Sequence, residues 1–301
     1  MTEFLWLFAA IAAYFLFALG NLGDKFVLAG PPKPQSYTFW VAAGGALSLF
    51  LIPFVGFSFP GYGQAALALS AGLAYIFGLY FLYTALEVCE VSRVMPAMGA
   101  FIAIFTLLFS FLIFGSKEAF PIRNMIAFSL LFLGSLVAVW EKGKSPAKEN
   151  FKIIVLAGAL FALSYNLSKL VFESQPFWQG FIWMRIGSLL GVSIFFAKTA
   201  ISEAFSPNPS FGKGNIGIFI FAQTAGGVGF VFESLSISLA QPAQLSFVAA
   251  LQGLQYIFLF IFTILLSLKF DFFKEKFSRS VFLQKISALA LIFFGIWIAF
   301  F

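Results

Sequence analysis

Long apolar stretches alternate along the 301 residues with short breaks that carry charges, prolines or glycines. The stretches run for about twenty residues without strand-like alternation, and a helix of that length crosses the roughly 30 Å hydrocarbon core of a membrane. Lipid offers the backbone no hydrogen-bond partner, so spanning segments are helices or a closed barrel, and a barrel would alternate polar and apolar positions. The pattern therefore predicts ten helices, at 4–29, 36–56, 64–86, 91–115, 120–140, 151–172, 177–199, 213–237, 242–268 and 280–301.

The most polar break, residues 141–150, lies almost at the middle of the chain and predicts a linker between residues 1–140 and 151–301. Short patterns recur in the same order in both halves: Asn21-Leu22 with Asn166-Leu167, Phe39-Trp40 with Ile182-Trp183, Gly78 with Gly229, and Gly134 with Gly295. This shared order indicates duplication of one unit. Because each half would have an odd number of spans, the halves would lie upside down relative to one another, as in many transporters.

Three short motifs add to this layout. The third predicted helix ends in Tyr80-x-x-Tyr83-Thr84-Ala85-Leu86, the fourth leads into Phe114-Gly115-Ser116-Lys117-Glu118, and Arg185 lies early in the second helix of the second half. With the five-plus-five layout, these residues resemble the ten-span form of the drug/metabolite transporter superfamily, which has two EamA-like domains. The resemblance implies an all-α membrane protein of ten transmembrane helices in two inverted five-helix repeats. The chain departs from the family at Pro96 and Pro242, which lie nearer the helix start than the usual proline.

The composition fits a chain whose main solvent is lipid, and it argues against several functions. Of the residues, 61% are hydrophobic and 10% are charged, with one cysteine and no histidine. The commonest metal ligand and general base is therefore missing, so we expect no metal, no cofactor and no enzyme. The net charge of +6 resides in short loops between apolar runs, which indicates membrane orientation and not a nucleic-acid partner.

The basic residues gather in the loops on one side of the predicted membrane, among them Lys142, Lys144, Lys274 and Lys276, whereas the other side has few, such as Lys117. The positive-inside rule makes the first side cytoplasmic and places both termini outside. Members of the family that the chain resembles are usually described with both termini inside. The two arguments conflict, so the sequence leaves the orientation open.

Two ionisable side chains within the predicted spans are candidate substrate-binding residues. Arg185 would lie roughly 12 Å deep by helical rise, and Glu233 would lie at a comparable depth in the next helix. A charge inside hydrocarbon is costly and should face a cavity or a partner. Arg185 could hold an anionic substrate group, with Glu233 as its counter-ion or as a proton-coupled carboxylate. The alternatives are a structural ion pair and an arginine that reaches the membrane interface.

Four uncharged polar residues, Tyr14, Gln223, Gln252 and Tyr256, are further candidates because they fall near the expected bilayer centre. Gln252 and Tyr256 would be one turn apart on one face of a continuous helix. Phenol and amide groups at this depth could line a polar cavity and replace the water around a substrate. They could equally bond one helix to another, which contributes about 0.6 kcal/mol per pair on average.

Together these observations predict a secondary transporter that moves a small polar or amphiphilic metabolite across the membrane by alternating access. No Walker-type phosphate loop is evident in the sequence, so energy would come from the solute gradient or from a coupled proton or cation. The alternatives are a flippase for a lipid-linked substrate and, with less support, an intramembrane enzyme that modifies lipid. We expect the protein to contact membrane lipid and a small-molecule substrate but not nucleic acid. We expect its oligomeric state to be a monomer or a homodimer.

Overall fold

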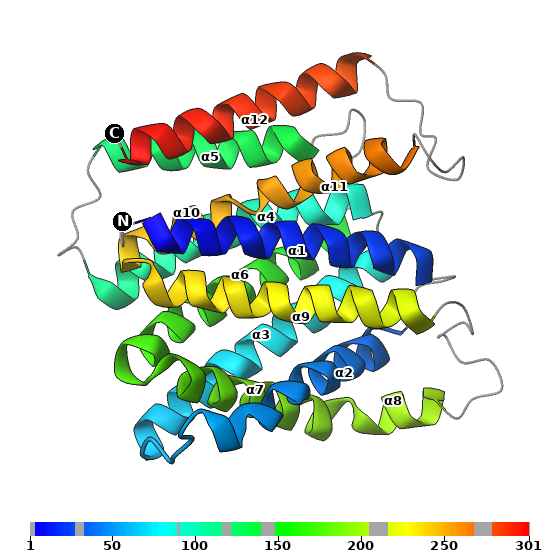
Figure 1. Ribbon diagram of the computed structural model, residues 1–301, viewed down its shortest axis with the longest axis vertical. Helices are drawn as coiled ribbons and strands as arrows, with labels where there is room; N and C mark the ends of the chain where they lie inside the picture. The colour runs from blue at the N-terminus through cyan, green and yellow to red at the C-terminus, as the bar shows by residue number, and fades with distance from the viewer. Residues whose placement is uncertain are drawn as a thin grey trace.

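The computed structural model describes residues 4–27, 33–88, 91–115, 122–139, 148–204, 216–267 and 279–300, and within these ranges the chain forms helices and has no strand (Figure 1). The longer helices are α1 (Leu5–Val27), α2 (Pro34–Gly45), α3 (Tyr62–Val88), α4 (Val91–Phe114), α5 (Ile122–Val139), α6 (Lys148–Ser174), α7 (Phe177–Phe195), α9 (Ile216–Leu239), α11 (Gly253–Ser267) and α12 (Arg279–Phe300). The shorter elements are the 3₁₀ segments η2 (Ala46–Phe54) and η3 (Pro242–Gln244) and the helices α8 (Ala197–Ala204) and α10 (Leu245–Ala250).

Seven helical segments in the described ranges are long and apolar enough to cross a membrane, judged by length and composition: Leu5–Leu22, Pro34–Phe54, Tyr62–Glu87, Ala97–Phe114, Phe151–Ser174, Ile220–Leu239 and Pro242–Phe262. The apolar parts of α5 and α12 are shorter. α7 is not among the seven, because the side chains of Gln179, Arg185 and Ser188 make it more polar. The chain is thus an all-helical, multi-pass membrane protein, as the sequence predicts, while the number of ten spans stays a prediction.

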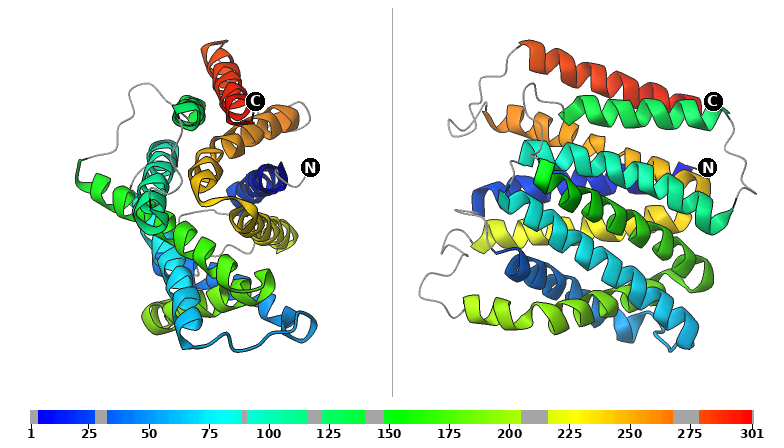
Figure 2. Two further views of the ribbon diagram at one scale, coloured as in Figure 1. Left: turned by 90° about the vertical axis from the view of Figure 1, so that its left-hand side faces the viewer. Right: turned by 180° about the vertical axis from the view of Figure 1, so that it is seen from behind.

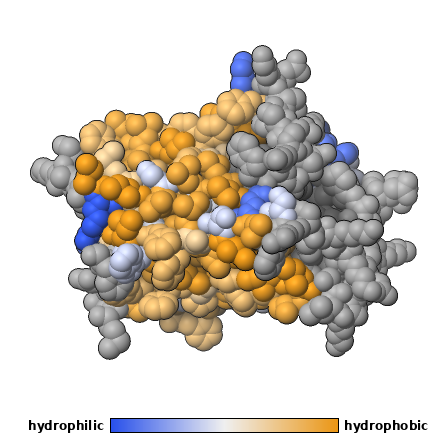
Figure 3. Space-filling view, turned by 90° about the horizontal axis from the view of Figure 1, so that it is seen from above, coloured by the Kyte–Doolittle hydropathy of each residue, from blue (hydrophilic) through white to orange (hydrophobic). Residues whose placement is uncertain are grey.

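The helices lie side by side and share two common ends (Figure 1, Figure 2). α5 and α12 lie at one extreme of this stack and α2, α7 and α8 at the other, with α1, α3, α4, α6 and α9 between them. α1 begins and α12 ends at the same end of the bundle, which is what an even number of crossings gives. Seen from above, apolar side chains cover much of the surface (Figure 3). Large exposed side chains such as Phe54 and Phe111 suit a lipid solvent.

Contacts between the two halves of the chain are reciprocal. α1 packs along α9 while α6 packs along α3, α11 contacts α1 while α4 contacts α6, and α5 packs along α12. Glycines allow the close approach of α5 and α12, since a Cβ on Gly134 would lie 3.0 Å from the carbonyl oxygen of Ala288. A Cβ on Gly295 would lie equally close, 3.0 Å, to the carbonyl oxygen of Ala127. Two glycines that recur in the sequence therefore occupy matching places in the fold.

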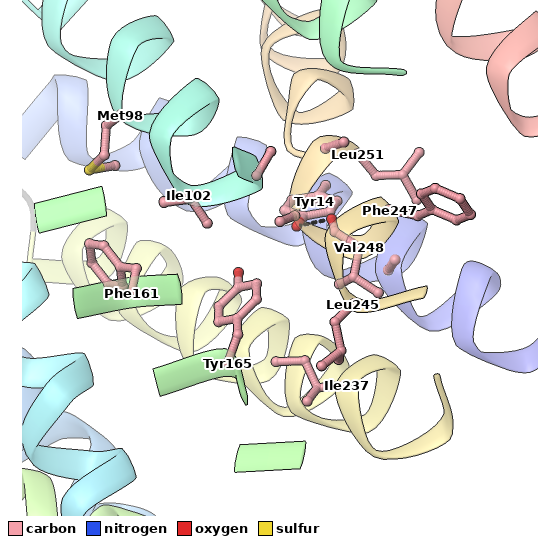
Figure 4. Close-up of a cluster of buried hydrophobic side chains, with 14 of the residues drawn as sticks. Tyr14, Met98, Ile102, Phe161, Tyr165, Ile237, Leu245, Phe247, Val248 and Leu251 are labelled. Atoms are coloured by element: carbon pink, nitrogen blue, oxygen red, sulfur yellow. Dashed lines mark hydrogen bonds between the residues drawn. The ribbon is translucent and has the colours of Figure 1, made fainter. Parts of the chain in front are cut away.

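A second recurring pair of glycines behaves in the same way. A Cβ on Gly78 of α3 would lie 3.2 Å from the ring of Phe161 on α6, and one on Gly229 of α9 would lie 3.0 Å from the ring of Phe17 on α1. Around these contacts, buried side chains of both halves form one hydrophobic core, part of which is shown in Figure 4. α9 is continuous through its glycines, so at Gly229 the small residue serves helix packing.

Two helices that the sequence predicts as continuous are interrupted. The segment 36–56 changes from α2 to the 3₁₀ segment η2 after Gly45, a position where glycine weakens the α-helix. The segment 242–268 divides into η3, α10 and α11, with Leu251 and Gln252 in a turn between α10 and α11. Of the predicted linker 141–150, residues 141–147 lie outside the described ranges, and 148–150 already belong to α6.

Candidate functional site

Arg185 lies near the middle of α7 and points into the bundle, with only 8% of the residue exposed. The carbon of its guanidinium group lies 3.5 Å from the ring centroid of Phe230 on α9, which places the cation against the face of that ring. The rings of Phe181 and Tyr75 lie 5.1 Å and 5.3 Å away. Aromatic rings attract a cation through their electron-rich faces, more strongly where water is excluded. Rings from α3, α7 and α9 thus form a cage that stabilises the arginine charge inside the protein.

The arginine side chain also reaches α2 at the point where this helix changes into η2. A Cβ on Gly45 would lie 3.1 Å from Nη1 of Arg185, which is closer than ordinary van der Waals contact. The missing side chain at Gly45 therefore leaves the space that the guanidinium group occupies.

Glu233 lies three residues after Phe230 on α9, so the two side chains lie on one face of the helix. The residue is 6% exposed, and its Oε1 accepts a hydrogen bond from the hydroxyl of Tyr165 on α6. Arg185 and Glu233 lie close enough to attract one another electrostatically. The Tyr75 hydroxyl lies within reach of the guanidinium group. Because both charged groups are buried among apolar helices, the loss of either one would be costly.

Tyr14 extends this polar cluster from α9 and α6 to α10. Its hydroxyl donates a hydrogen bond of 2.7 Å to the carbonyl oxygen of Val248, drawn as a dashed line in Figure 4. The hydroxyl of Tyr165 interacts with that of Tyr14 as well as with Glu233. A continuous row of polar groups therefore joins the Glu233 carboxylate to the backbone of α10.

This row ends at the interruption between α10 and α11. The backbone N–H of Gln252 donates to the carbonyl of Ala249, three residues earlier, as in a 3₁₀ helix. In an α-helix it would donate to the carbonyl of Val248, which here accepts a hydrogen bond from Tyr14 instead. The next freed carbonyl, that of Ala250, accepts a hydrogen bond from the Ser135 hydroxyl of α5. Two hydroxyl groups from other helices thus satisfy carbonyls that the interrupted helix releases, as buried backbone groups require.

The six predicted residues are distributed unevenly around this cluster. Arg185, Glu233 and Tyr14 belong to it. Gln252 lies in the turn between α10 and α11, and its side chain packs against α4. A Cβ on Gly99 of α4 would lie 3.3 Å from the Oε1 atom of Gln252. Gln223 lies on α9 about 15 Å before Glu233 by helical rise. For Tyr256 only the backbone, in α11, lies within what the structure describes.

One sequence expectation about these residues is wrong. Gln252 and Tyr256 were expected one turn apart on a single helical face, but α11 begins at Gly253 and Gln252 precedes it in a turn. At this turn the carbonyls of Val248 and Ala250 accept hydrogen bonds from the hydroxyls of Tyr14 and Ser135 on other helices in place of N–H groups of their own helix. Arg185 itself is 8% exposed, and its guanidinium group lies in the aromatic cage.

Comparisons with known proteins place the fold but not the activity. No family model matches the chain, and no curated protein matches it. Among solved structures, 28 chains are similar. One of them, described only as "Crystal structure of protein", has a TM-score of 0.68 and 14% sequence identity, and the match covers 97% of this chain and 95% of the other. The likeness shows a shared fold over nearly the whole length of both proteins.

Several residues of the cluster escape sequence reasoning. Tyr75 and Tyr165 are phenols near the middle of apolar helices, and the reasoning that selects Tyr14 would have selected them too. Phe230 and Gly45 carry no such signal, because phenylalanine and glycine are abundant throughout the chain, with 46 and 26 copies. Within the described residues, no group of three or more His, Cys, Asp or Glu side chains could hold a metal ion.

Proposed function

We propose that this protein is a secondary transporter with ten spans in two inverted five-helix repeats, related to the drug/metabolite transporters with two EamA-like domains. It moves a small polar or amphiphilic metabolite by alternating access, it is not an enzyme, and an anionic group of the substrate binds Arg185. The observation that carries this proposal is the guanidinium group of Arg185, a residue that is only 8% exposed and whose cation lies against the face of the Phe230 ring.

The geometry of arginine explains why the cage favours an anion. The guanidinium group is planar, and its five N–H donors point outward in that plane, where they match the two oxygens of a carboxylate or phosphate. Phe230 covers a face of the group and does not use these donors. The Tyr75 hydroxyl interacts with them, and Glu233 attracts the group electrostatically. An oxyanion of a substrate would fill the remaining donors without displacing the rings.

Two features of the fold support transport by alternating access. The reciprocal packing of α1 with α9 and of α6 with α3 is what two similar five-helix units related by a twofold axis would give. The interrupted helix formed by α10 and α11 adjoins the buried polar row, and transporters commonly place substrate sites at such interruptions near the bilayer centre.

The test begins with purified protein and a thermal-unfolding screen of carboxylated, phosphorylated and neutral metabolites. A ligand bound only by the folded state raises the midpoint. A compound that stabilises the wild type is then followed into sealed proteoliposomes, where a transporter moves it, an enzyme changes its lipid and a scaffold does neither. Arg185→Ala should abolish both stabilisation and uptake.

The matched control is Arg123→Ala on α5, because Arg123 is exposed and donates to the carbonyl of Ala299 at 3.5 Å. This variant should bind and transport like the wild type. Normal uptake by Arg185→Ala would contradict the proposed role of the guanidinium group. Flux of a lipid-linked substrate alone would point instead to a flippase.

A further inference from the structure

The buried polar cluster is electrically balanced when it is empty. It contains one cation, Arg185, and one acidic group, Glu233, which are 8% and 6% exposed. They attract one another across the cluster, and with Glu233 ionised their charges sum to zero. A buried site of zero net charge gains little by adding an anion, because the complex would carry an uncompensated negative charge in a medium of low dielectric constant.

The groups that face Glu233 from the surrounding helices do not change this balance. Among the described residues, these groups are the phenols of Tyr75 on α3 and Tyr165 on α6 and the guanidinium group of Arg185 on α7, while Tyr14 on α1 interacts with Tyr165. Lys169 lies one turn beyond Tyr165 on α6, but it is engaged elsewhere: its Nζ donates to the carbonyl of Ser238 at 3.1 Å and pairs with Glu173 at 3.6 Å.

We propose that binding of a monoanionic group at Arg185 is accompanied by uptake of one proton on Glu233, so that the anion and the proton enter the site together. The carboxylate takes the proton from water on the side to which the site is open and becomes a carboxylic acid, and no bond of the anion changes. The occupied site is then neutral again. This inference rests on the proposed function, since it requires that Arg185 binds the substrate.

Tyr165, supported by Tyr14, can form a hydrogen bond with Glu233 in both its ionised and its protonated form. When the carboxylate is ionised, the Tyr165 hydroxyl donates to it. When the carboxyl group is protonated, it donates to the Tyr165 oxygen, and the Tyr165 hydroxyl turns to donate to the oxygen of Tyr14. Tyr14 can accept because its own proton is already directed at the Val248 carbonyl. Tyr165 is therefore a positioning residue for the proton.

The inference is tested by isothermal titration calorimetry on purified protein in lipid nanodiscs, in pairs of buffers with different heats of ionisation. The probes are benzoate and benzenesulfonate, which stay ionised over about pH 5.5 to 8.5, and neutral benzamide serves as the control. For the wild type we expect uptake of about one proton per anion bound. The dissociation constant should rise by up to about tenfold per pH unit at the alkaline end.

The decisive variant is Glu233→Gln, whose amide oxygen can still accept the hydrogen bond of Tyr165. It should bind the anions without proton uptake and with no pH dependence. Tyr165→Phe should displace the pH at which affinity begins to fall, whereas a purely structural role would leave that pH unchanged. Glu173→Gln is the matched control, because this glutamate is 43% exposed and pairs with Lys169. It should retain the wild-type proton count.

The outcomes separate the two proposals. A wild type that binds benzoate or benzenesulfonate without proton uptake at any pH overturns the coupling to Glu233 and leaves the anion site standing. Folded wild type that binds neither probe contradicts the anion site and hence the proposed function. Should Glu233→Gln fail to fold, the proton count of the wild type in the two buffers still decides the matter.

Discussion

The contact between α3 and α7 allows a sharp prediction, because it depends on glycine backbone atoms that leave no space for a methyl group. A Cβ on Gly72 would lie 2.0 Å from the carbonyl oxygen of Met184 and 2.8 Å from the backbone nitrogen of Ser188. Both neighbours are backbone atoms of α7 and cannot turn aside. In Gly72→Ala, the two helices must therefore move apart by about 1.4 Å to restore ordinary contact.

The cost follows from what that movement breaks. The Ser188 hydroxyl donates to the Gly72 carbonyl at 3.0 Å, and the movement would stretch this bond beyond hydrogen-bonding distance, a loss of about 1 kcal/mol. Overpacking adds roughly 1–3 kcal/mol, and the better helix propensity of alanine returns up to about 1 kcal/mol. We expect a net destabilisation of roughly 1–4 kcal/mol. Because α3 carries Tyr75 and α7 carries Arg185, anion binding should weaken as well.

The assay is reversible unfolding in mixed micelles with increasing dodecyl sulfate, followed by tryptophan fluorescence. Gly63→Ala, near the start of the same helix, is the control because a Cβ there meets nothing within 4 Å. The control should stay within about 1 kcal/mol of the wild type. Equal stability of Gly72→Ala and the wild type would refute the reasoning, since the two helices would then have to accommodate a methyl group where the structure has backbone.

Two further variants probe the interrupted helix and the arginine cage. Tyr14→Phe leaves the carbonyl of Val248 without its donor, so it should lower unfolding stability in the same assay by about 0.5–1.5 kcal/mol, and a variant more stable than the wild type would speak against this bond. Gly45→Ala places a methyl group 3.1 Å from Nη1 of Arg185 and should weaken benzoate binding about tenfold, or 1.4 kcal/mol, as measured by calorimetry. Gly44→Ala, whose Cβ meets nothing within 4 Å, should bind normally, and equal affinity of both variants would remove Gly45 from the site.

The place of the polar row in the fold suggests how binding could reach the rest of the protein. Glu233 is linked through Tyr165 and Tyr14 to the backbone of α10, next to the interruption that precedes α11. A change of hydrogen bonding at Glu233 would therefore alter the contacts of the backbone at the interruption, where some helical hydrogen bonds are already missing. Helix interruptions bend at lower cost than continuous helices, because fewer backbone bonds must break.

The sequence alone determines that this chain is a helical membrane protein. Both conclusions rest on local properties, namely the length of the apolar runs and the need of every backbone group for an internal partner. The approximate bounds of the helices follow for the same reason, since charged residues, prolines and glycines mark the breaks. The two ionisable candidates, Arg185 and Glu233, also stand out locally, because a charge within an apolar run is expensive wherever it points.

Tertiary structure decides which side chains meet and where a helix is interrupted. Tyr14 and Val248 are 234 positions apart, and nothing near either residue in the sequence shows that they share a hydrogen bond. Phe230 and Gly45 acquire their roles only because the rotations of α9 and α2 turn them toward Arg185. At the interruption next to Gln252, the Ala250 carbonyl accepts a hydrogen bond from Ser135, which is on another helix. Such contacts depend on how helices rotate and cross, which is settled by the packing of the whole bundle and not by any one segment.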